Sequence, residues 1–455
     1  MRRCLLPLLV LSACSLPAHA EPGARAWQAG DHHVHSEWSV DWDRGTNPPT
    51  PVRGGDSPYT RTRNAQVAHA NGLAWMVHTD HGGPGHSVVN RDHAWPALQA
   101  ARRAVPGLIQ YYGMEFDVPA AEHASLIIAP GPHEREQLFA IERDYSRGEP
   151  VPPATRDEES QMLAALAYLR TLDPLPLMFV NHPSRTATGV GAWGDVAPHE
   201  LRAWHDAAPR VLVGMEGAPG HQAAGAHRGL YRHAQAPTMG GFDQMTAQVG
   251  GVWDAMLAEG RRFWITATSD SHVNLRDGGR DFDPGQYSKT YVWARRDAGD
   301  ILDGLREGRM FAVTGELIDA LDLRVSGPGG ASATLGETLA LAPDATMRAA
   351  LKVRQPHAGH RNGQHPPLRH IELIVGEPGT DGRPRMRTRR FEPAQFQRDG
   401  EWVSVAWELP APARGGFVRV RGSSTGEAVP LPDVAGEDPW QDVWFYSNPV
   451  FVQAR

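Results

Sequence analysis

Short apolar runs alternate with longer helical stretches from about residue 27 to residue 316. A helix is predicted over 158–171, where Met162, Leu166 and Leu169 recur at helical spacing. A strand followed by a helix, repeated along the chain, indicates a parallel sheet, and the length of this part suits a barrel of β/α units. The clearest buried strands are predicted at 72–77, 175–180, 210–215 and 262–267.

From about Leu317 the pattern changes to alternating apolar and polar positions, interrupted by glycine and proline. Residues 402–407 and 416–420 show it most clearly. Alternation with a period of two is typical of strands that bury one face, and a run of such strands is typical of a β-sandwich. The sequence therefore predicts an α/β barrel over 27–316, followed by an all-β sandwich domain over 317–455.

Residues 1–20 have the features of a secretory signal peptide. Arg2 and Arg3 precede an apolar run, and Ala18-His19-Ala20 suits signal peptidase. The alternative is a lipoprotein signal, because the residues before Cys14 also fit a lipid-attachment site. We therefore expect an exported protein, periplasmic or secreted, with a lipid anchor at Cys14 as the alternative.

Charge and composition narrow the class of partner. The formal net charge is −7 at pH 7, and loss of Arg2 and Arg3 with the leader makes it more negative, which argues against general nucleic-acid binding. Both cysteines lie in residues 1–20, so the mature chain forms no disulfide. No later stretch approaches the roughly 20 apolar residues that span a membrane. We expect a small-molecule partner.

Residues with metal-binding side chains follow the predicted strands. His33 and His35 are two residues apart, so they project from one face of an extended chain, whereas His32 faces the opposite side. Such paired imidazoles suit zinc, manganese or iron. The carboxyl ends of the strands of a β/α barrel converge on one mouth, which predicts a metal site there. The other candidates are Thr79-Asp80-His81, Glu115 with His123, His182-Pro183 and Asp270-Ser271-His272.

This series of motifs, in this order over roughly residues 29–275, resembles the PHP superfamily, named for polymerase and histidinol phosphatase domains. The resemblance implies a distorted seven-stranded β/α barrel, (β/α)7, that holds two or three divalent metal ions at its mouth. It also implies how the ligands divide. The first metal takes His33, His35, Glu115 and Asp270; the second takes the bridging Glu115 with His123 and His182; the third takes His81 and His272, with Asp41 as a partner.

The charges of the candidate ligands support this division. A carboxylate can bridge two cations where a neutral imidazole cannot, so Glu115 suits the shared position. Three carboxylates, on Asp41, Glu115 and Asp270, offset only part of about four to six positive charges on the metals. The surplus attracts an anionic substrate and lowers the pKa of bound water to about 7.

Three further residues are candidates for supporting roles. Asp80 is expected to cap its turn or to orient His81, and Glu216 to face the mouth of the barrel behind the ligands. Arg185 is a candidate to grip a phosphate through two hydrogen bonds, with a solvated loop residue as the alternative.

The leading hypothesis is a metal-dependent hydrolase, most specifically a phosphoesterase that uses a metal-bridging hydroxide, with Glu115, Asp270 and Arg185 as its catalytic residues. The alternative is hydrolysis of carbamates or carboxylic esters, because the added β domain and the ending at 444–450 are similar to exported, carbaryl-hydrolase-like PHP proteins. A third reading is a non-catalytic periplasmic protein that binds metal or glycan. For the β domain, the readings are substrate binding or a packing role.

Overall fold

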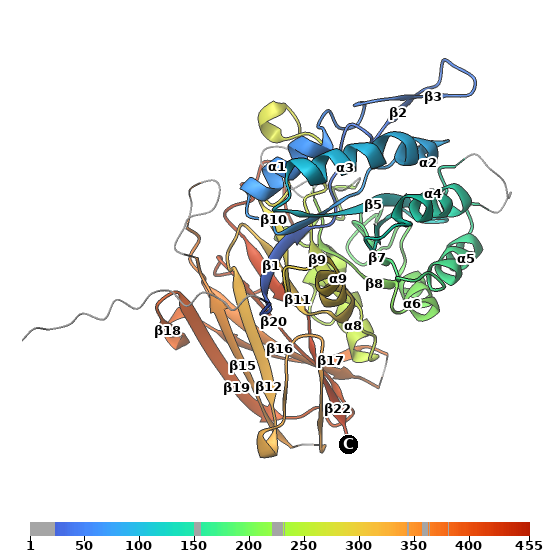
Figure 1. Cartoon of the computed structure of the whole chain (residues 1–455). Helices are drawn as coiled ribbons and strands as arrows, with labels where there is room; N and C mark the ends of the chain where they lie inside the picture. Colours follow the sequence, from blue (N-terminus) through green and yellow to red (C-terminus); the bar gives the residue numbers. More distant parts are fainter. Residues whose placement is uncertain are drawn as a thin grey trace, which may run out of the picture.

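The computed structural model describes residues 23–149, 156–220, 231, 233–343, 345–356, 363, 365–380 and 382–455 (Figure 1). The expected signal peptide and the alternative lipid anchor at Cys14 lie outside these residues. The fold is mixed α/β, with a large mixed sheet, a five-stranded antiparallel sheet and a small two-stranded hairpin. A search of the helices in the described residues finds none that is both long and apolar enough for a membrane span.

Seven strands of the mixed sheet carry the candidate residues, and the four strands predicted at 72–77, 175–180, 210–215 and 262–267 are among them, as β4, β7, β8 and β9. The seven lie side by side in the order β1 (Ala26–Asp31), β4 (Trp75–His78), β5 (Ile109–Asp117), β6 (His123–Ile128), β7 (Leu177–Val180), β8 (Leu212–Ala218) and β9 (Trp264–Ala267).

The expectation of a parallel sheet is wrong at β6, which runs antiparallel to both β5 and β7. The connection 118–122 is too short for the crossover that a parallel pair needs, so it closes a hairpin. The remaining neighbours of this group pair in parallel. As a result β6 begins, rather than ends, at the edge where the other strands end.

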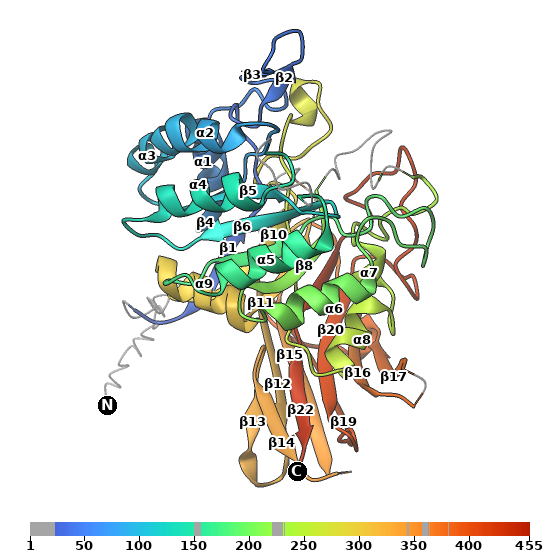
Figure 2. The same ribbon diagram turned by 90° about the vertical axis from the view of Figure 1, so that its right-hand side faces the viewer.

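Helices cover the outer face of this part of the sheet, and Figure 2 shows α4, α5 and α6 side by side across it. The helix predicted over 158–171 is α5, which buries Met162, Leu166 and Leu169. The α-helices of the described residues are α1 (Arg61–Ala70), α2 (His86–Val89), α3 (Trp95–Ala104), α4 (Glu134–Tyr145), α5 (Glu159–Leu169), α6 (Pro198–Ala207), α7 (Gln244–Ala247), α8 (Val252–Ala258) and α9 (Ala298–Glu307). A π-helical segment (Asn90–Ala94) joins α2 to α3.

The sheet curls so that β9 also lies against β10 (Ser288–Ala294) and β11 (Met310–Thr314). Side chains make this contact. Thr290 Oγ1 accepts from the N–H of Ala267 at 2.9 Å and donates to its carbonyl at 2.9 Å. The Asn448 amide bonds the N–H and the carbonyl of Ile265 at 2.9 and 3.0 Å. The strand ends are thereby gathered around one centre.

Strands beyond Leu317 confirm the predicted alternation in part. Residues 402–407 lie in β19 and largely follow it, as does β15, where buried positions alternate with more exposed ones. For residues 416–420, in β20, the prediction of one buried face is wrong, because positions 417–423 are all buried. The antiparallel sheet has the order β13 (Ser332–Ala333), β12 (Ala320–Ser326), β15 (Thr346–Arg354), β19 (Trp402–Pro410) and β18 (Gln397–Asp399). The rest extend the mixed sheet: β14 (Thr338–Leu341), β16 (His370–Pro378), β17 (Pro384–Phe391), β20 (Gly416–Ser423), β21 (Trp444–Ser447) and β22 (Val450–Ala454).

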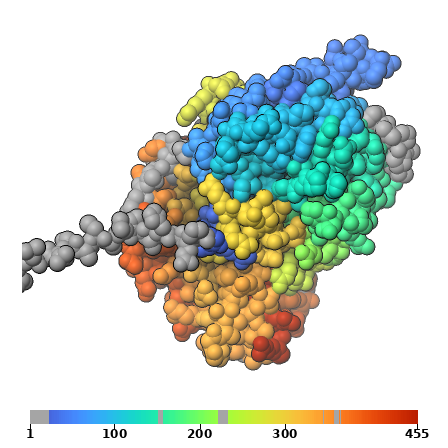
Figure 3. Space-filling model, in the orientation of Figure 1, coloured from blue at the N-terminus to red at the C-terminus, as the bar shows by residue number. Residues whose placement is uncertain are grey.

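The mixed sheet therefore crosses the predicted boundary near Leu317. Strand β11 pairs with β21, with Phe311 opposite Ser447. A fully buried ion pair crosses the same junction, since Arg419 Nε lies 2.6 Å from Asp254 Oδ1. In the space-filling view the orange and red atoms of the C-terminal strands lie directly against the part drawn in blue, green and yellow (Figure 3).

Candidate metal centre

The residues at the strand ends meet at one edge of the curled sheet, as predicted. Eight of the nine predicted ligands fall into groups whose ligand atoms all lie within 4.8 Å of one another, and each group could hold a metal ion. The groups are His33, His35, Glu115 and Asp270; Glu115, His123 and His182; and His35, Asp56, His81 and His272.

The first group is buried at the centre of the site. Asp270 Oδ1 lies 3.0 Å from His33 Nε2 and 3.1 Å from His35 Nε2, so two imidazoles face one carboxylate oxygen. His33 Nε2 is also 3.2 Å from Glu115 Oε1. Both imidazoles and both carboxylates point their ligand atoms at a shared point, which is the arrangement that a cation needs.

Glu115 links the first group to the second. Its Oε1 atom lies 2.9 Å from His123 Nδ1 and 3.0 Å from His182 Nε2, in addition to its contact with His33. The other nitrogen of His123 lies 3.2 Å from Asp117 Oδ1. One buried carboxylate oxygen is therefore shared among three imidazoles, the position that the sequence assigned to a bridging ligand.

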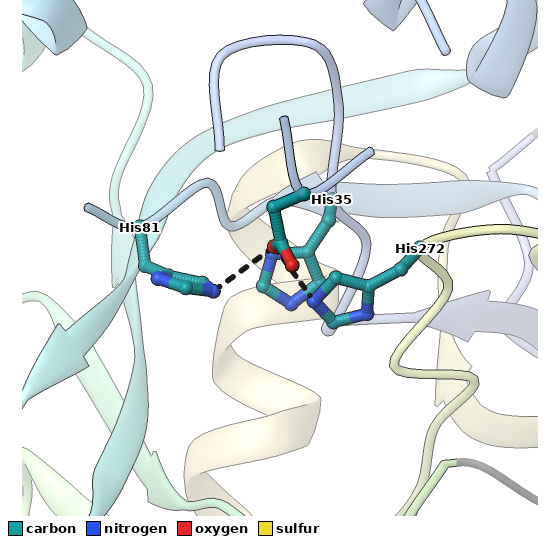
Figure 4. Close-up of side chains that lie close together, drawn as sticks. His35, His81 and His272 are labelled. Carbon is teal, nitrogen blue, oxygen red and sulfur yellow. Dashed lines mark ion pairs between the residues drawn. The ribbon is translucent and has the colours of Figure 1, made fainter. Parts of the chain in front are cut away.

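The third group contains Asp56 in place of Asp41. Asp56 Oδ2 lies 3.2 Å from His81 Nε2 and 3.1 Å from His272 Nε2, and these ion pairs are dashed in Figure 4. The ring of His35 stacks on that of His272, with centroids 3.7 Å apart.

Asp41 lies outside the cluster, contrary to the sequence prediction. It is exposed on β2 (Asp41–Asp43), which pairs with β3 (Thr50–Val52) in a hairpin. The hairpin leads the chain away from the centre, and the chain returns at Asp56. There Ser57 Oγ donates to the carbonyl of His272 at 2.9 Å and holds the segment in place.

Glu216 sets the tautomer of one ligand, which agrees with the supporting role expected for it. His33 Nδ1 lies 2.7 Å from Glu216 Oε1, and a carboxylate can only accept, so Nδ1 carries the proton. With a cation bound at the centre, the lone pair of Nε2 would face it. Glu216 Oε2 also accepts from the backbone N–H of His182 at 2.6 Å.

Asp80 orients His35 rather than His81. It accepts from Ser39 Oγ at 3.1 Å, and His35 Nδ1 lies 2.8 Å from the same hydroxyl. The buried guanidinium of Arg61 holds Asp80 through Nε at 2.9 Å and Nη2 at 2.6 Å. Burial alone would raise the pKa of Asp80, but Arg61 and the hydrogen bonds from serine hold it well below its usual range. Asp80 therefore stays a carboxylate.

Backbone strain and protonation also mark the site. His182 and Asp270 have positive φ values of 28° and 45°, which cost of order 1–3 kcal/mol in residues other than glycine and gather at functional sites. Burial, and then Arg185, lower the pKa of His182 to about 4, so its ring is neutral, the form that binds a cation. Burial would raise the pKa of Glu115, but His123 and His33 lower it well below its usual range.

A cavity of about 380 Å³ opens onto the cluster. Arg185 lies in its wall, where Nε donates to Glu122 Oε2 at 3.0 Å and Nη2 donates to the same oxygen. The alternative of a freely solvated loop residue is therefore wrong, because the Arg185 side chain is only 21 % exposed. The wall consists of Asp56, His81, Glu115, His123, Arg185, Asp270, His272, Val273, Gly279, Arg280 and Asp281.

Several residues of the site were not predicted from the sequence, among them Asp56, Asp117 and Arg280. No strand-end position marks Asp56 or Arg280, since both lie in loops. Asp117 ends β5, so its strand-end position is the sequence signal that could have found it. His32 faces away, as predicted: its Nε2 lies 2.8 Å from Thr266 Oγ1, and its ring stacks on Phe179.

Comparison of the chain with models of protein families gives no match, and a search of curated proteins gives none either. The chemistry of the cluster and its cavity is therefore the basis for inferring a function.

Proposed function

We propose that the protein is a metal-dependent hydrolase of the PHP type that acts on phosphoesters. The observation that carries this proposal is Glu115 Oε1, a buried carboxylate oxygen within 3.2 Å of nitrogens from His33, His123 and His182. We also propose that the curled sheet is a distorted (β/α)7 barrel and that the C-terminal strands form a sandwich beside it.

The residues fit two or three divalent cations of the zinc, manganese or iron class. Imidazole and carboxylate are the donors that such ions take in proteins. His182 is neutral, and its Nδ1 atom is buried without a hydrogen-bond partner among the described residues. Cations bound by these groups of ligands would polarise an ester oxygen and lower the pKa of water towards about 7.

The other residues position the substrate and the ligands. Glu122 holds Arg185 by Nε and Nη2, and Nη1 makes no hydrogen bond to any described residue. That nitrogen is available to a non-bridging oxygen of a phosphoryl group. Glu216 keeps a proton on Nδ1 of His33. Asp80 does the same for His35 indirectly, because it accepts from the Ser39 hydroxyl, which in turn accepts from Nδ1 of His35.

Hydrolysis of carbamates or carboxylic esters is a second candidate, which one observation favours. The carboxylate of Glu122 neutralises the guanidinium of Arg185, so this pair adds no net positive charge to the cavity. A neutral acyl substrate is then less disfavoured than it would be beside an unpaired Arg185. A non-catalytic metal- or glycan-binding protein is the third reading.

A substrate panel on metal-analysed protein tests the proposal. The panel contains 4-nitrophenyl phosphate, bis(4-nitrophenyl) phosphate, 4-nitrophenyl acetate and a naphthyl N-methylcarbamate. We expect turnover of a phosphoester that a chelator abolishes. Turnover of the acetate or carbamate alone would establish the second candidate, and metal binding without any turnover would establish the third.

Glu115→Gln is the decisive variant. It removes the negative charge that the shared ligand supplies, so we expect a loss of turnover of roughly 100-fold or more and a lower metal content, with the fold retained. Glu136→Gln, on the exposed face of α4, is the matched control and should behave as the wild type. Unchanged turnover in Glu115→Gln would overturn the proposal.

We further propose that the chain is exported. Mass spectrometry of the mature protein distinguishes the two forms, because signal peptidase cleavage leaves Glu21 at the N-terminus whereas lipoprotein processing leaves a lipid on Cys14.

A further inference from the structure

A second arginine lines the cavity over the metal cluster. Arg280 is exposed at the rim, and its guanidinium makes no hydrogen bond or ion pair with any described residue. Arg185, by contrast, is largely buried and held by Glu122. The cavity therefore has in its wall one arginine paired with a carboxylate and, at its mouth, one arginine without an ion-pair partner among the described residues.

The loop that carries Arg280 is fixed to the metal cluster. Asp281 Oδ2 accepts from the backbone N–H groups of His272 at 3.0 Å and Val273 at 3.1 Å. A Cβ atom on Gly279 would lie 1.9 Å from the carbonyl oxygen of Val273, so only glycine allows the loop to close. Arg280 follows Gly279 directly, and its backbone is thereby placed beside the ligand His272.

The acidic residues nearest to Arg280 in the sequence have other hydrogen-bond partners. The Asp281 carboxylate accepts from the loop backbone, and Asp277 accepts from the hydroxyl of Tyr59. Arg280 thus places a positive charge at the mouth of a cavity whose floor is suited to cations. A guanidinium in such a place binds oxyanions through two parallel hydrogen bonds.

We propose that Arg280 determines specificity by binding an oxyanion of the substrate that is remote from the reacting bond. The inference rests on the proposed function, in that the reacting group lies at the metal cluster. It narrows the substrate class to esters with a second anionic group at the end near the rim.

Binding of non-hydrolysable phosphonates tests this proposal without turnover. Phenylphosphonate has one anionic group, whereas 3- and 4-phosphonobenzoate add a carboxylate at two different distances from the phosphonate. By titration calorimetry on the metal-loaded protein, we expect one phosphonobenzoate to bind about tenfold more tightly than phenylphosphonate, the usual effect of one charge-assisted hydrogen bond.

Three variants distinguish a specific role of Arg280 from a general effect of positive charge on the loop. Arg280→Gln should abolish the preference and leave phenylphosphonate binding unchanged. Arg280→Lys should retain part of it, because the charge remains. Arg276→Gln, an exposed arginine of the same loop that does not line the cavity, should keep the full preference.

The proposal is overturned if the wild type binds all three phosphonates equally, binds none, or if Arg280→Gln keeps the preference. Its failure is distinct from that of the proposed function. Ester turnover without any phosphonobenzoate preference would overturn only the role of Arg280. A preference that depends on Arg280, without turnover of any ester, would support that role and overturn the hydrolase.

Discussion

At the scale of single residues, the site depends on carboxylates that decide where protons lie. Glu216 accepts from Nδ1 of His33, and Asp80 orients His35 through the hydroxyl of Ser39, so both imidazoles would present Nε2 to a cation at the centre. Glu115 has a different task, because one of its oxygens is shared by three imidazoles. The surroundings of each carboxylate therefore determine whether it orients an imidazole or is shared among several.

Asp56 and Asp41 give a matched pair of substitutions. Asp56→Asn removes the only carboxylate of the third group, so we expect the protein to bind one metal ion fewer. Asp41→Asn changes an exposed residue of the β2–β3 hairpin and should leave the metal content unchanged. Elemental analysis of both purified variants measures the stoichiometry. An equal loss in both variants, or in neither, would contradict the assignment of Asp56.

At the scale of elements, apolar periodicity predicted where strands and helices lie but not how they pair. The strands β4, β7, β8 and β9 were predicted because each is a short apolar run, and the helix α5 because its apolar residues recur at helical spacing. The direction of β6 depends on the short connection 118–122, which periodicity does not reveal. The eight predicted ligands that the structure brings together follow strand ends, where topology gathers distant residues, whereas Asp56 and Arg280 lie in loops whose course depends on tertiary contacts.

The contact between α2 and α4 contains a buried ion pair with a pH dependence. His86 Nδ1 lies 2.5 Å from Glu142 Oε1, and both side chains are almost fully buried. Burial would lower the pKa of His86, but the charge and hydrogen bond of Glu142 raise it to about 9. The folded pKa exceeds the unfolded value of about 6.5. The stabilisation is therefore complete below pH 6.5 and is lost as the pH rises through about 9.

His86→Gln tests this contact. It should lower the free energy of unfolding by about 3 kcal/mol at pH 6, because the Glu142 charge is left buried without its partner. The difference from the wild type should shrink between pH 6.5 and pH 9.5, as urea unfolding at several pH values will show. His133→Gln, at an exposed position, is the control. A difference that does not vary with pH would rule out the protonated pair.

At the scale of the whole molecule, the two predicted parts share one sheet. The change of pattern near Leu317 predicted where the all-β strands begin. It did not predict that Phe311 pairs opposite Ser447, since the register of strands so distant in sequence leaves no local signal. The C-terminal strands thus continue the sheet whose other strands hold the candidate metal ligands, and the buried pair of Arg419 and Asp254 ties them to α8.

Substitution of Asn448 tests whether this shared sheet supports the candidate metal site. Its buried amide bonds both backbone groups of Ile265 in β9, the strand that leads to Asp270 and His272. Asn448→Ala leaves those groups without partners, at a cost of roughly 2–4 kcal/mol in the free energy of unfolding.

Because β9 leads directly to two ligands, Asn448→Ala should also weaken metal binding, measured by competition with a chelator, although residue 448 touches no ligand. Gln453→Ala, exposed on β22, should change neither quantity. Lower stability with unchanged metal affinity would show that the C-terminal strands support the fold without holding the site. A loss of both would show that one continuous sheet transmits the packing of the C-terminal strands to the cluster, which is what the placement of Asn448 predicts.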